Sequence, residues 1–97
     1  MTVKVIALTS VNCAEIEALS TYLAITGPLL EEAGATILER HSIVTTIVGD
    51  EMPMTVTIIE YPSIEATDKV FKSAEYGLLK EIRSKAFRHY QVGLLEN

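Results

Sequence analysis

Four segments of the chain are rich in β-branched and aliphatic residues, and two longer segments repeat apolar residues at helical spacing. The strand-like segments are residues 2–9, 35–48, 54–61 and 88–95. The helical ones run between Ile16 and Ala33 and between Ala66 and Ala86. Their order, β-α-β-β-α-β, predicts an α+β, ferredoxin-like fold with a four-stranded antiparallel sheet and two helices on one face. We expect a single domain over residues 1–97.

Local signals predict where the first helical segment begins and ends. Asn12 is a good N-cap, and Glu15 follows at the spacing of a capping box. Pro28 lies inside the helical pattern, so a kink or a split helix is expected near Thr26. Gly34 is the expected left-handed residue that ends this helix.

The second helical segment follows directly from a strand. Pro62 cannot donate to a strand ladder and should end the third strand, and Ser63 is placed to cap the helix that follows. Ser73 lies in the middle of the helical pattern. We expect the helix to stop near Lys72 and to restart with Ser73 as a new cap.

Apolar residues on both sides of the predicted strands indicate that neither face of the sheet is left to water. The two helices cover one face. A chain of 97 residues buries only about 60–70% of its unfolded surface, so an added subunit would help its stability. The sequence therefore predicts a homodimer through the open sheet face, with a barrel-like interior between two sheets.

Charge and composition narrow the classes of partner. Asp and Glu number 13 against 8 Lys and Arg, for a net charge of -5, and no basic stripe suits a nucleic acid. The first residues form neither a signal peptide nor a membrane span, so no membrane partner and a cytoplasmic location are expected. Cys13 is the only cysteine, and we interpret it as a small, partly buried residue.

Separated motifs add a resemblance to a known family. The strings "GATILER" and "IIEYPSIEATDKVFKSAEYGLLKEIR" resemble the family catalogued as domain of unknown function 1330, over most of the chain. The matching positions are Gly34, Leu38, Arg40, Tyr61, Pro62, Ser63, Ser73, Glu75, Tyr76 and Arg83. The resemblance implies the dimeric α/β-barrel superfamily, which includes cofactor-free monooxygenases, lactone isomerases and haem-dependent chlorite-degrading enzymes.

Arg40 and His41 are the predicted catalytic residues. Histidine titrates near neutral pH, and Glu39 points to the same side of the strand as His41. The alternative for His41 and Glu39 is a plain surface pair. Arg40 faces the other way, toward the helices, where its paired donors suit a carboxylate or enolate oxygen. Its alternative is an internal ion pair with Glu60 or Glu75.

Tyr61, Tyr76 and Arg83 are the predicted substrate-binding residues. Tyr76 and Arg83 are seven residues apart and share a helix face, and Tyr61 ends the strand that leads into that helix. Together they would line a cleft between helix and sheet. The alternative is that the tyrosine rings fill core space with their hydroxyls at the rim.

No metal site and no cofactor are predicted, because His41 and His89 lie on different strands without the spacing of a local ligand pair.

The sequence leaves two functions open. One is a small cofactor-independent enzyme of the proton-transfer, isomerase or monooxygenase type, acting on a small oxygenated or carboxylate-bearing molecule. The other is a non-catalytic dimeric module that binds a small ligand or supports assembly.

Overall fold

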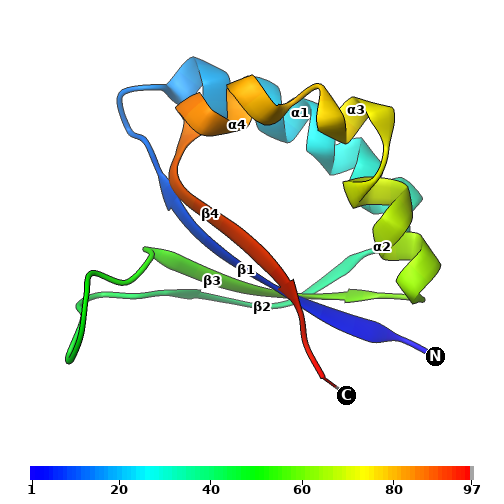
Figure 1. Cartoon of the computed structure of the whole chain (residues 1–97), viewed down its shortest axis with the longest axis horizontal. Coiled ribbons are helices and arrows are strands. Elements are labelled where there is room, and N and C mark those ends of the chain that lie inside the picture. The colour runs from blue at the N-terminus through cyan, green and yellow to red at the C-terminus, as the bar shows by residue number, and fades with distance from the viewer. Residues whose placement is uncertain (97) are drawn as a thin grey trace.

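A computed structural model describes residues 1–96 and shows one antiparallel sheet with the helices on one side of it (Figure 1). The elements are β1 (Val3–Val11), α1 (Ile16–Glu32), β2 (Thr36–Ser42), β3 (Thr55–Tyr61), α2 (Ile64–Phe71), α3 (Ala74–Gly77), α4 (Lys80–Ala86) and β4 (Phe87–Leu94). The strand order is β2-β3-β1-β4, which places β2 and β4 at the edges. The predicted ferredoxin-like α+β arrangement is confirmed.

The core lies between the two central strands and the helices. Val5 of β1 pairs with Ile59 of β3, and alternate residues on both strands face the helical layer. Tyr61 and Val70 are almost completely buried there, at 0% and 1% exposure. No helix among residues 1–96 is both long enough and apolar enough to cross a membrane.

The start of α1 differs from the prediction. The Asn12 side chain accepts a hydrogen bond from the backbone N–H of Ala14 at 3.1 Å, and its own N–H donates to the carbonyl of Ala86 at 2.8 Å. Asn12 thus closes a turn that is tied to the end of α4. The helix begins only at Ile16, so Asn12 is not the N-cap and the capping box with Glu15 is wrong.

Pro28 lies within α1, and the helix runs without a break from Ile16 to Glu32. The expectation of a split helix is therefore wrong. A proline removes one backbone donor, but Tyr22 and Thr26 in the preceding turns are buried against the rest of the protein. This packing holds the two halves of the helix in one element.

Gly34 ends α1 as predicted, with a φ of 78°. Its N–H donates to the carbonyl of Glu31 at 3.0 Å, and the next N–H, of Ala35, donates to Leu30 at 3.0 Å. A Cβ at this position would lie 3.0 Å from Cγ of Pro62. Backbone conformation and close packing thus both favour glycine here.

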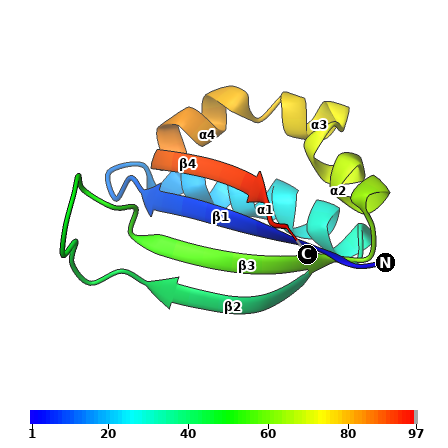
Figure 2. The same cartoon turned by 60° about the horizontal axis from the view of Figure 1, so that its bottom comes forward.

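The hairpin between β2 and β3 is longer than the sequence indicates. β2 ends at Ser42, so the predicted strand over residues 35–48 is wrong after that point. The last backbone bond joins the Ile43 N–H to the carbonyl of Met54 at 2.7 Å, and the following loop projects past the sheet (Figure 2). Val44 and Ile47 in this loop are 96% and 91% exposed. Their β-branched side chains do not form a strand where no neighbouring strand pairs with them.

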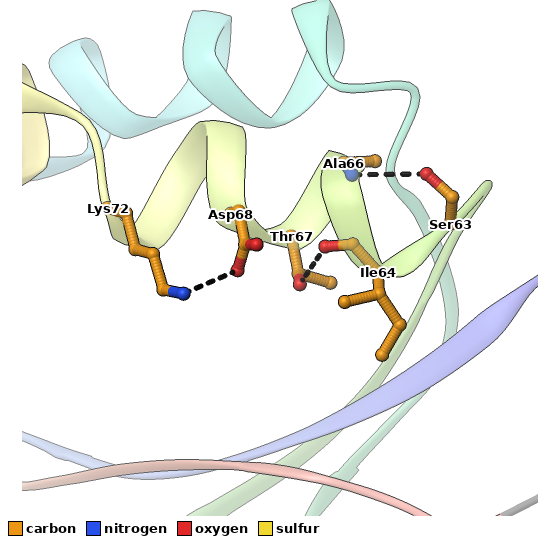
Figure 3. A network of polar contacts seen from close by, with 6 residues as sticks. All are labelled: Ser63, Ile64, Ala66, Thr67, Asp68 and Lys72. Carbon is orange, nitrogen blue, oxygen red and sulfur yellow. Dashed lines mark hydrogen bonds and ion pairs between the residues drawn. The ribbon is translucent and has the colours of Figure 1, made fainter.

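Figure 3 shows how α2 begins directly after β3. The Ser63 hydroxyl accepts a hydrogen bond from the N–H of Ala66 at 3.1 Å, which confirms Ser63 as the N-cap. On the side of α2 away from α1, Lys72 and Asp68 form an ion pair at 3.4 Å. A cap directly after Pro62 turns the chain from the sheet into the helical layer.

Ser73 interrupts the second helical segment, as predicted. Its hydroxyl accepts a hydrogen bond from the N–H of Tyr76 at 3.1 Å and donates to the carbonyl of Val70 at 2.8 Å. One side chain therefore satisfies the end of α2 and the start of α3. The result is a bend that directs Tyr76 toward the sheet side of the helical layer.

Candidate functional site

All four tyrosines of the chain line a cavity of about 120 Å³ between the helices and the sheet. We call it the tyrosine cavity. Its other walls are mainly aliphatic and aromatic, with residues from α1, α2 and three strands. Each tyrosine comes from a different element: Tyr22 from α1, Tyr61 from β3, Tyr76 from α3 and Tyr90 from β4.

Three of the hydroxyl groups form a connected cluster. The hydroxyl of Tyr22 donates to that of Tyr90 at 2.8 Å. The hydroxyls of Tyr76 and Tyr90 lie 2.7 Å apart and are also hydrogen-bonded. Tyr90 is therefore the centre of the cluster and joins α1 to α3 through the edge strand β4.

Arg83 lies against this cluster from α4. Its guanidinium carbon is 4.8 Å from the ring centre of Tyr76 and 5.3 Å from that of Tyr90. A cation held over aromatic faces at such distances is attracted by the ring electrons. Nevertheless, the buried Nη1 of Arg83 and the buried hydroxyl of Tyr61 have no hydrogen-bond partner among the described residues.

Burial raises the pKa of three of the four tyrosines, Tyr22, Tyr61 and Tyr90. Burial raises the pKa of Tyr61 to about 12. Burial also raises the pKa of Tyr22, and burial together with the bonds to Tyr22 and Tyr76 raises that of Tyr90. At neutral pH these side chains are therefore neutral hydroxyls that donate hydrogen bonds, not phenolate bases.

The predicted substrate-binding residues lie together in this region. Tyr61 and Tyr76 line the cavity, and Phe71 stands between their rings, at 6.2 Å and 5.2 Å from them. Arg83 covers the ring of Tyr76 although the helix is broken between α3 and α4. The role of these three residues in binding a substrate stays a prediction.

The sequence analysis missed Tyr22 and Tyr90. The signal for Tyr22 is its position three residues after Leu19, on the inner side of α1. Tyr90 pairs with Thr9 of β1, and Val92 pairs with Ala7, so both face the helices. Alternation along β4 would have placed Tyr90 in the cleft, but only the fold brings it to Tyr22, 68 residues away in sequence.

Arg40 faces the helical side of the sheet because β2 contains an irregularity. The register shifts between Ile37 and Glu39, so Ile37 pairs with Ile59 and Arg40 pairs with Thr57 on the same face. Arg40 lines a second hollow of about 310 Å³, which we call the Arg40 hollow. Four residues line both the Arg40 hollow and the tyrosine cavity: Ala7, Leu23, Leu30 and Ile59. Within residues 1–96, Arg40 makes no ion pair with Glu60 or Glu75.

His41 lies on the opposite, open face of β2. Its Nε2 contacts Oε1 of Glu39 at 3.2 Å, and both side chains are more than 60% exposed. The structure thus does not bring His41 together with the tyrosines or with the Arg40 hollow inside one chain. Its predicted catalytic role is not supported by this placement and stays a prediction.

The remaining candidate groups are dispersed. His89 contacts Gln91 at 3.0 Å on β4, and β4 and β2 are opposite edges of the sheet. Among residues 1–96 no three His, Cys, Asp or Glu side chains gather as metal ligands. Cys13 is exposed, whereas the sequence indicated partial burial.

Solved structures share this architecture. A protein of unknown function from Rhodopseudomonas palustris aligns with a TM-score of 0.79 and 21% identity, over 99% of this chain and 82% of that one. A variant of SnoaB, a cofactor-independent oxygenase from Streptomyces nogalater, aligns with a TM-score of 0.62 and 12% identity, over 99% and 92%. A dimeric protein of unknown function from Bacteroides fragilis, described as having a ferredoxin-like fold, gives 0.57 and 11%, over 99% and 96%. At these identities the likeness establishes the fold alone.

Sequence comparison gives a family. The model of the family described as "Domain of unknown function (DUF1330)" matches residues 4–96. No functionally curated protein matches the chain significantly.

Proposed function

Since this chain belongs to the DUF1330 family, whose description assigns no activity, we propose its function from the cleft: a small cofactor-independent enzyme that transfers protons on a small oxygenated molecule. The observation that carries the proposal is the buried tyrosine cluster. Tyr22, Tyr76 and Tyr90 line the cavity, and their hydroxyl groups form a connected hydrogen-bonded cluster. Neutral donors in an apolar site stabilise negative charge that develops on a carbonyl oxygen.

Arg40 is proposed to orient the substrate from the adjoining hollow. Its guanidinium is on the helical side of the sheet, and the residues shared by the Arg40 hollow and the tyrosine cavity place the two side by side. Arginine binds a carboxylate or enolate oxygen through paired N–H donors. In this arrangement an acidic group of the substrate lies in the Arg40 hollow and its reacting carbonyl lies among the tyrosines.

Two chemical outcomes suit this site. Donation of a hydrogen bond to a carbonyl oxygen acidifies the neighbouring C–H group, so that water or a buffer base takes its proton and an enolate forms. Return of a proton at another carbon gives isomerisation, and reaction of the enolate with dioxygen gives oxygenation. The likeness to SnoaB, a cofactor-independent oxygenase, supports the second outcome only as an analogy of fold.

Proton transfer can be tested without knowing the substrate. Small ketones, keto acids and 1,3-dicarbonyl compounds are incubated with the protein in D₂O, and ¹H NMR measures loss of the C–H signal beside each carbonyl. We expect faster exchange than in buffer for at least one compound, and an oxygen electrode in the same samples separates oxygenation from isomerisation. Exchange at the buffer rate for the whole panel, without oxygen uptake, would argue against an enzyme.

Variants assign the roles. Arg40→Gln should slow the exchange, whereas Arg88→Gln, an exposed arginine whose Nη2 contacts Sδ of Met54, is the matched control and should not. His41→Gln tests the remaining prediction for His41. If His41→Gln retains turnover, His41 has no role in the mechanism. If turnover is lost, the open face of the sheet is part of the active site.

The second candidate is a non-catalytic module that binds a small ligand. The observation in its favour is that no complete set of nucleophile, base and orienting group lines the tyrosine cavity among residues 1–96. This second candidate predicts that a bound compound shields the tyrosine side chains from solvent and raises the melting temperature of the protein. The compound itself should not be converted. The exchange assay above distinguishes it from the enzyme.

We also propose a homodimer through the open sheet face. Ile6 and Leu8 of β1 pair with Ile58 and Val56 of β3, and these four side chains form an apolar stripe in the middle of that face. The edge strands carry Glu39, His41, His89 and Gln91 on either side of the stripe. An apolar centre with a polar rim is typical of protein interfaces, and one solved structure of this fold is described as dimeric.

Light scattering tests the dimer. Ile58→Lys should give a folded monomer or abolish folding, because it places a charge in the apolar stripe. Leu78→Lys is the matched control, since Leu78 is 82% exposed on the helical side, and this variant should remain dimeric. A wild-type chain that is a stable monomer at micromolar concentration contradicts the proposal.

A further inference from the structure

Three of the four tyrosine hydroxyls in the tyrosine cavity are bonded to one another. The hydroxyls of Tyr22, Tyr76 and Tyr90 carry one hydrogen each, and the two bonds among them use two of these three hydrogens. Tyr22 donates its hydrogen to Tyr90. The third hydrogen lies on Tyr76 or Tyr90, and the hydroxyl oxygens of the cluster keep free lone pairs that can accept it, so the cluster by itself is balanced.

Tyr61 supplies an unused donor. Its side chain is completely buried and lines the cavity, and its hydroxyl has no hydrogen-bond partner among residues 1–96. A buried hydroxyl without a partner is destabilising, because it has given up its hydrogen bonds to water. A phenylalanine would fill the same space without this cost, so the hydroxyl has no evident structural purpose in the unliganded chain.

The charges nearest the cavity are positive. Arg83 lies over the rings of Tyr76 and Tyr90, and its buried Nη1 has no hydrogen-bond partner within residues 1–96; Arg40 lies in the adjoining hollow. No Asp or Glu of the described chain lines the tyrosine cavity or the Arg40 hollow. Although the chain has a net charge of -5, the cleft itself therefore favours a negative or electron-rich ligand.

Size and shape restrict the ligand further. The cavity volume of about 120 Å³ is somewhat below the roughly 150 Å³ of an apolar cavity that admits benzene. Phe71 and Tyr76 meet at 81°, so flat aromatic surfaces form part of the wall. A flat single-ring molecule therefore fits only with part of it in the adjoining Arg40 hollow of about 310 Å³.

We infer that the tyrosine cavity selects a flat, single-ring-sized carboxylate or carbonyl compound, whose oxygen accepts a hydrogen bond from Tyr61. Arg83 favours the anion without being the direct donor. This inference rests on the proposed function for its site, but it concerns what the site binds and not whether binding leads to reaction. It makes Tyr61 a residue that determines specificity.

Three ligands of one shape test the inference. Benzoate is an anionic acceptor, acetophenone a neutral acceptor, and benzylammonium a cationic donor. Ligand-observed NMR at millimolar concentration should show binding in the order benzoate, acetophenone, benzylammonium, with benzylammonium roughly tenfold or more weaker than benzoate. Equal binding of all three, binding of benzylammonium alone, or no binding of benzoate and acetophenone overturns the inference.

Tyr61→Phe is the decisive variant. It should weaken benzoate binding by roughly three- to tenfold while leaving the melting temperature unchanged or higher, because the hydroxyl that it removes is unpaired without ligand. A purely structural hydroxyl would instead lower the melting temperature and leave binding unchanged. Thr21→Ala, on the exposed side of α1, is the control that removes a hydroxyl away from the cavity; it should leave benzoate binding unchanged and raise the melting temperature slightly, because alanine has the higher helix propensity.

The outcome is separable from that of the proposed function. Benzoate binding with the predicted response to Tyr61→Phe, but without turnover of any compound, supports the inferred ligand preference and contradicts the proposed enzyme activity. The opposite result is turnover that Tyr61→Phe does not affect, on compounds that bind with no preference for acceptors. It supports the enzyme and contradicts the inferred ligand preference.

Discussion

Replacement of Tyr90 by phenylalanine is the most direct test of the tyrosine cluster. The change keeps the ring, which packs edge-on against Tyr22 and near Phe87, and removes only the hydroxyl. That hydroxyl accepts a bond from Tyr22 at 2.8 Å and shares another with Tyr76 at 2.7 Å. The variant therefore breaks both bonds at once and leaves two partly buried hydroxyls without their partner.

The expected loss follows from these two bonds. A neutral hydrogen bond contributes about 0.5–1.5 kcal/mol net, so Tyr90→Phe should lower the free energy of unfolding by about 1–3 kcal/mol. For a domain of this size, about 2 kcal/mol corresponds to a fall in melting temperature of roughly 8–16 °C. Tyr22→Phe breaks only one bond and should cost about 1 kcal/mol.

Urea unfolding followed by far-UV circular dichroism measures these differences, because the chain has no tryptophan and the variants alter tyrosine fluorescence. All samples need the same protein concentration, since association would add to the apparent stability. In the double variant, adding Tyr22→Phe to Tyr90→Phe should cost nothing further, because the bond between them is already gone. The central role of Tyr90 is refuted if Tyr90→Phe is no more destabilising than Tyr22→Phe, or if the two losses simply add.

Three further predictions concern pH, a turn and a cap. Burial raises the pKa of Tyr61 to about 12, whereas an unfolded tyrosine ionises near 10. The free energy of unfolding should therefore be constant below about pH 9 and fall as the pH rises from 10 to 12. Unchanged stability between pH 10 and 12 in urea titrations contradicts this prediction. Gly34→Ala should cost about 1–2 kcal/mol because φ is 78° and its Cβ would approach Pro62, whereas Gly77→Ala, with open space around it, should be neutral or stabilising in the same assay. Ser63→Ala should cost about 1 kcal/mol by removing the cap of α2, while Ser84→Ala, whose exposed hydroxyl only bonds back to the carbonyl of Lys80, should change the melting temperature little.

Local chemistry made the second half of the chain largely predictable. Pro62, Ser63 and Ser73 act within a few residues of themselves, by lacking an N–H or by accepting one from the next turn. Gly34 is likewise identified by a conformation that other residues adopt at a cost. Such effects are visible in a sequence because both partners lie in the same short segment.

The first half shows where this reasoning fails. Asn12 has the chemistry of a helix cap, but its N–H bonds to Ala86 in a distant helix, and it closes a turn instead. Pro28 should break a helix, yet packing of the buried face around Tyr22 and Thr26 keeps α1 continuous. In both cases a tertiary contact outweighs a local preference of about 1–3 kcal/mol.

The sequence by itself determined the order of the elements, the fold and the family, because periodicity and caps are local properties that survive in one dimension. The grouping of Tyr61, Tyr76 and Arg83 was also predictable, since a strand end and the helix after it remain neighbours. Only the tertiary structure decided that Tyr22 and Tyr90 complete the cluster, because they meet through strand pairing across 68 residues. It also decided that Arg40 and His41, adjacent in sequence, face opposite sides of the sheet, so that a single residue step along β2 separates the cleft from the open face.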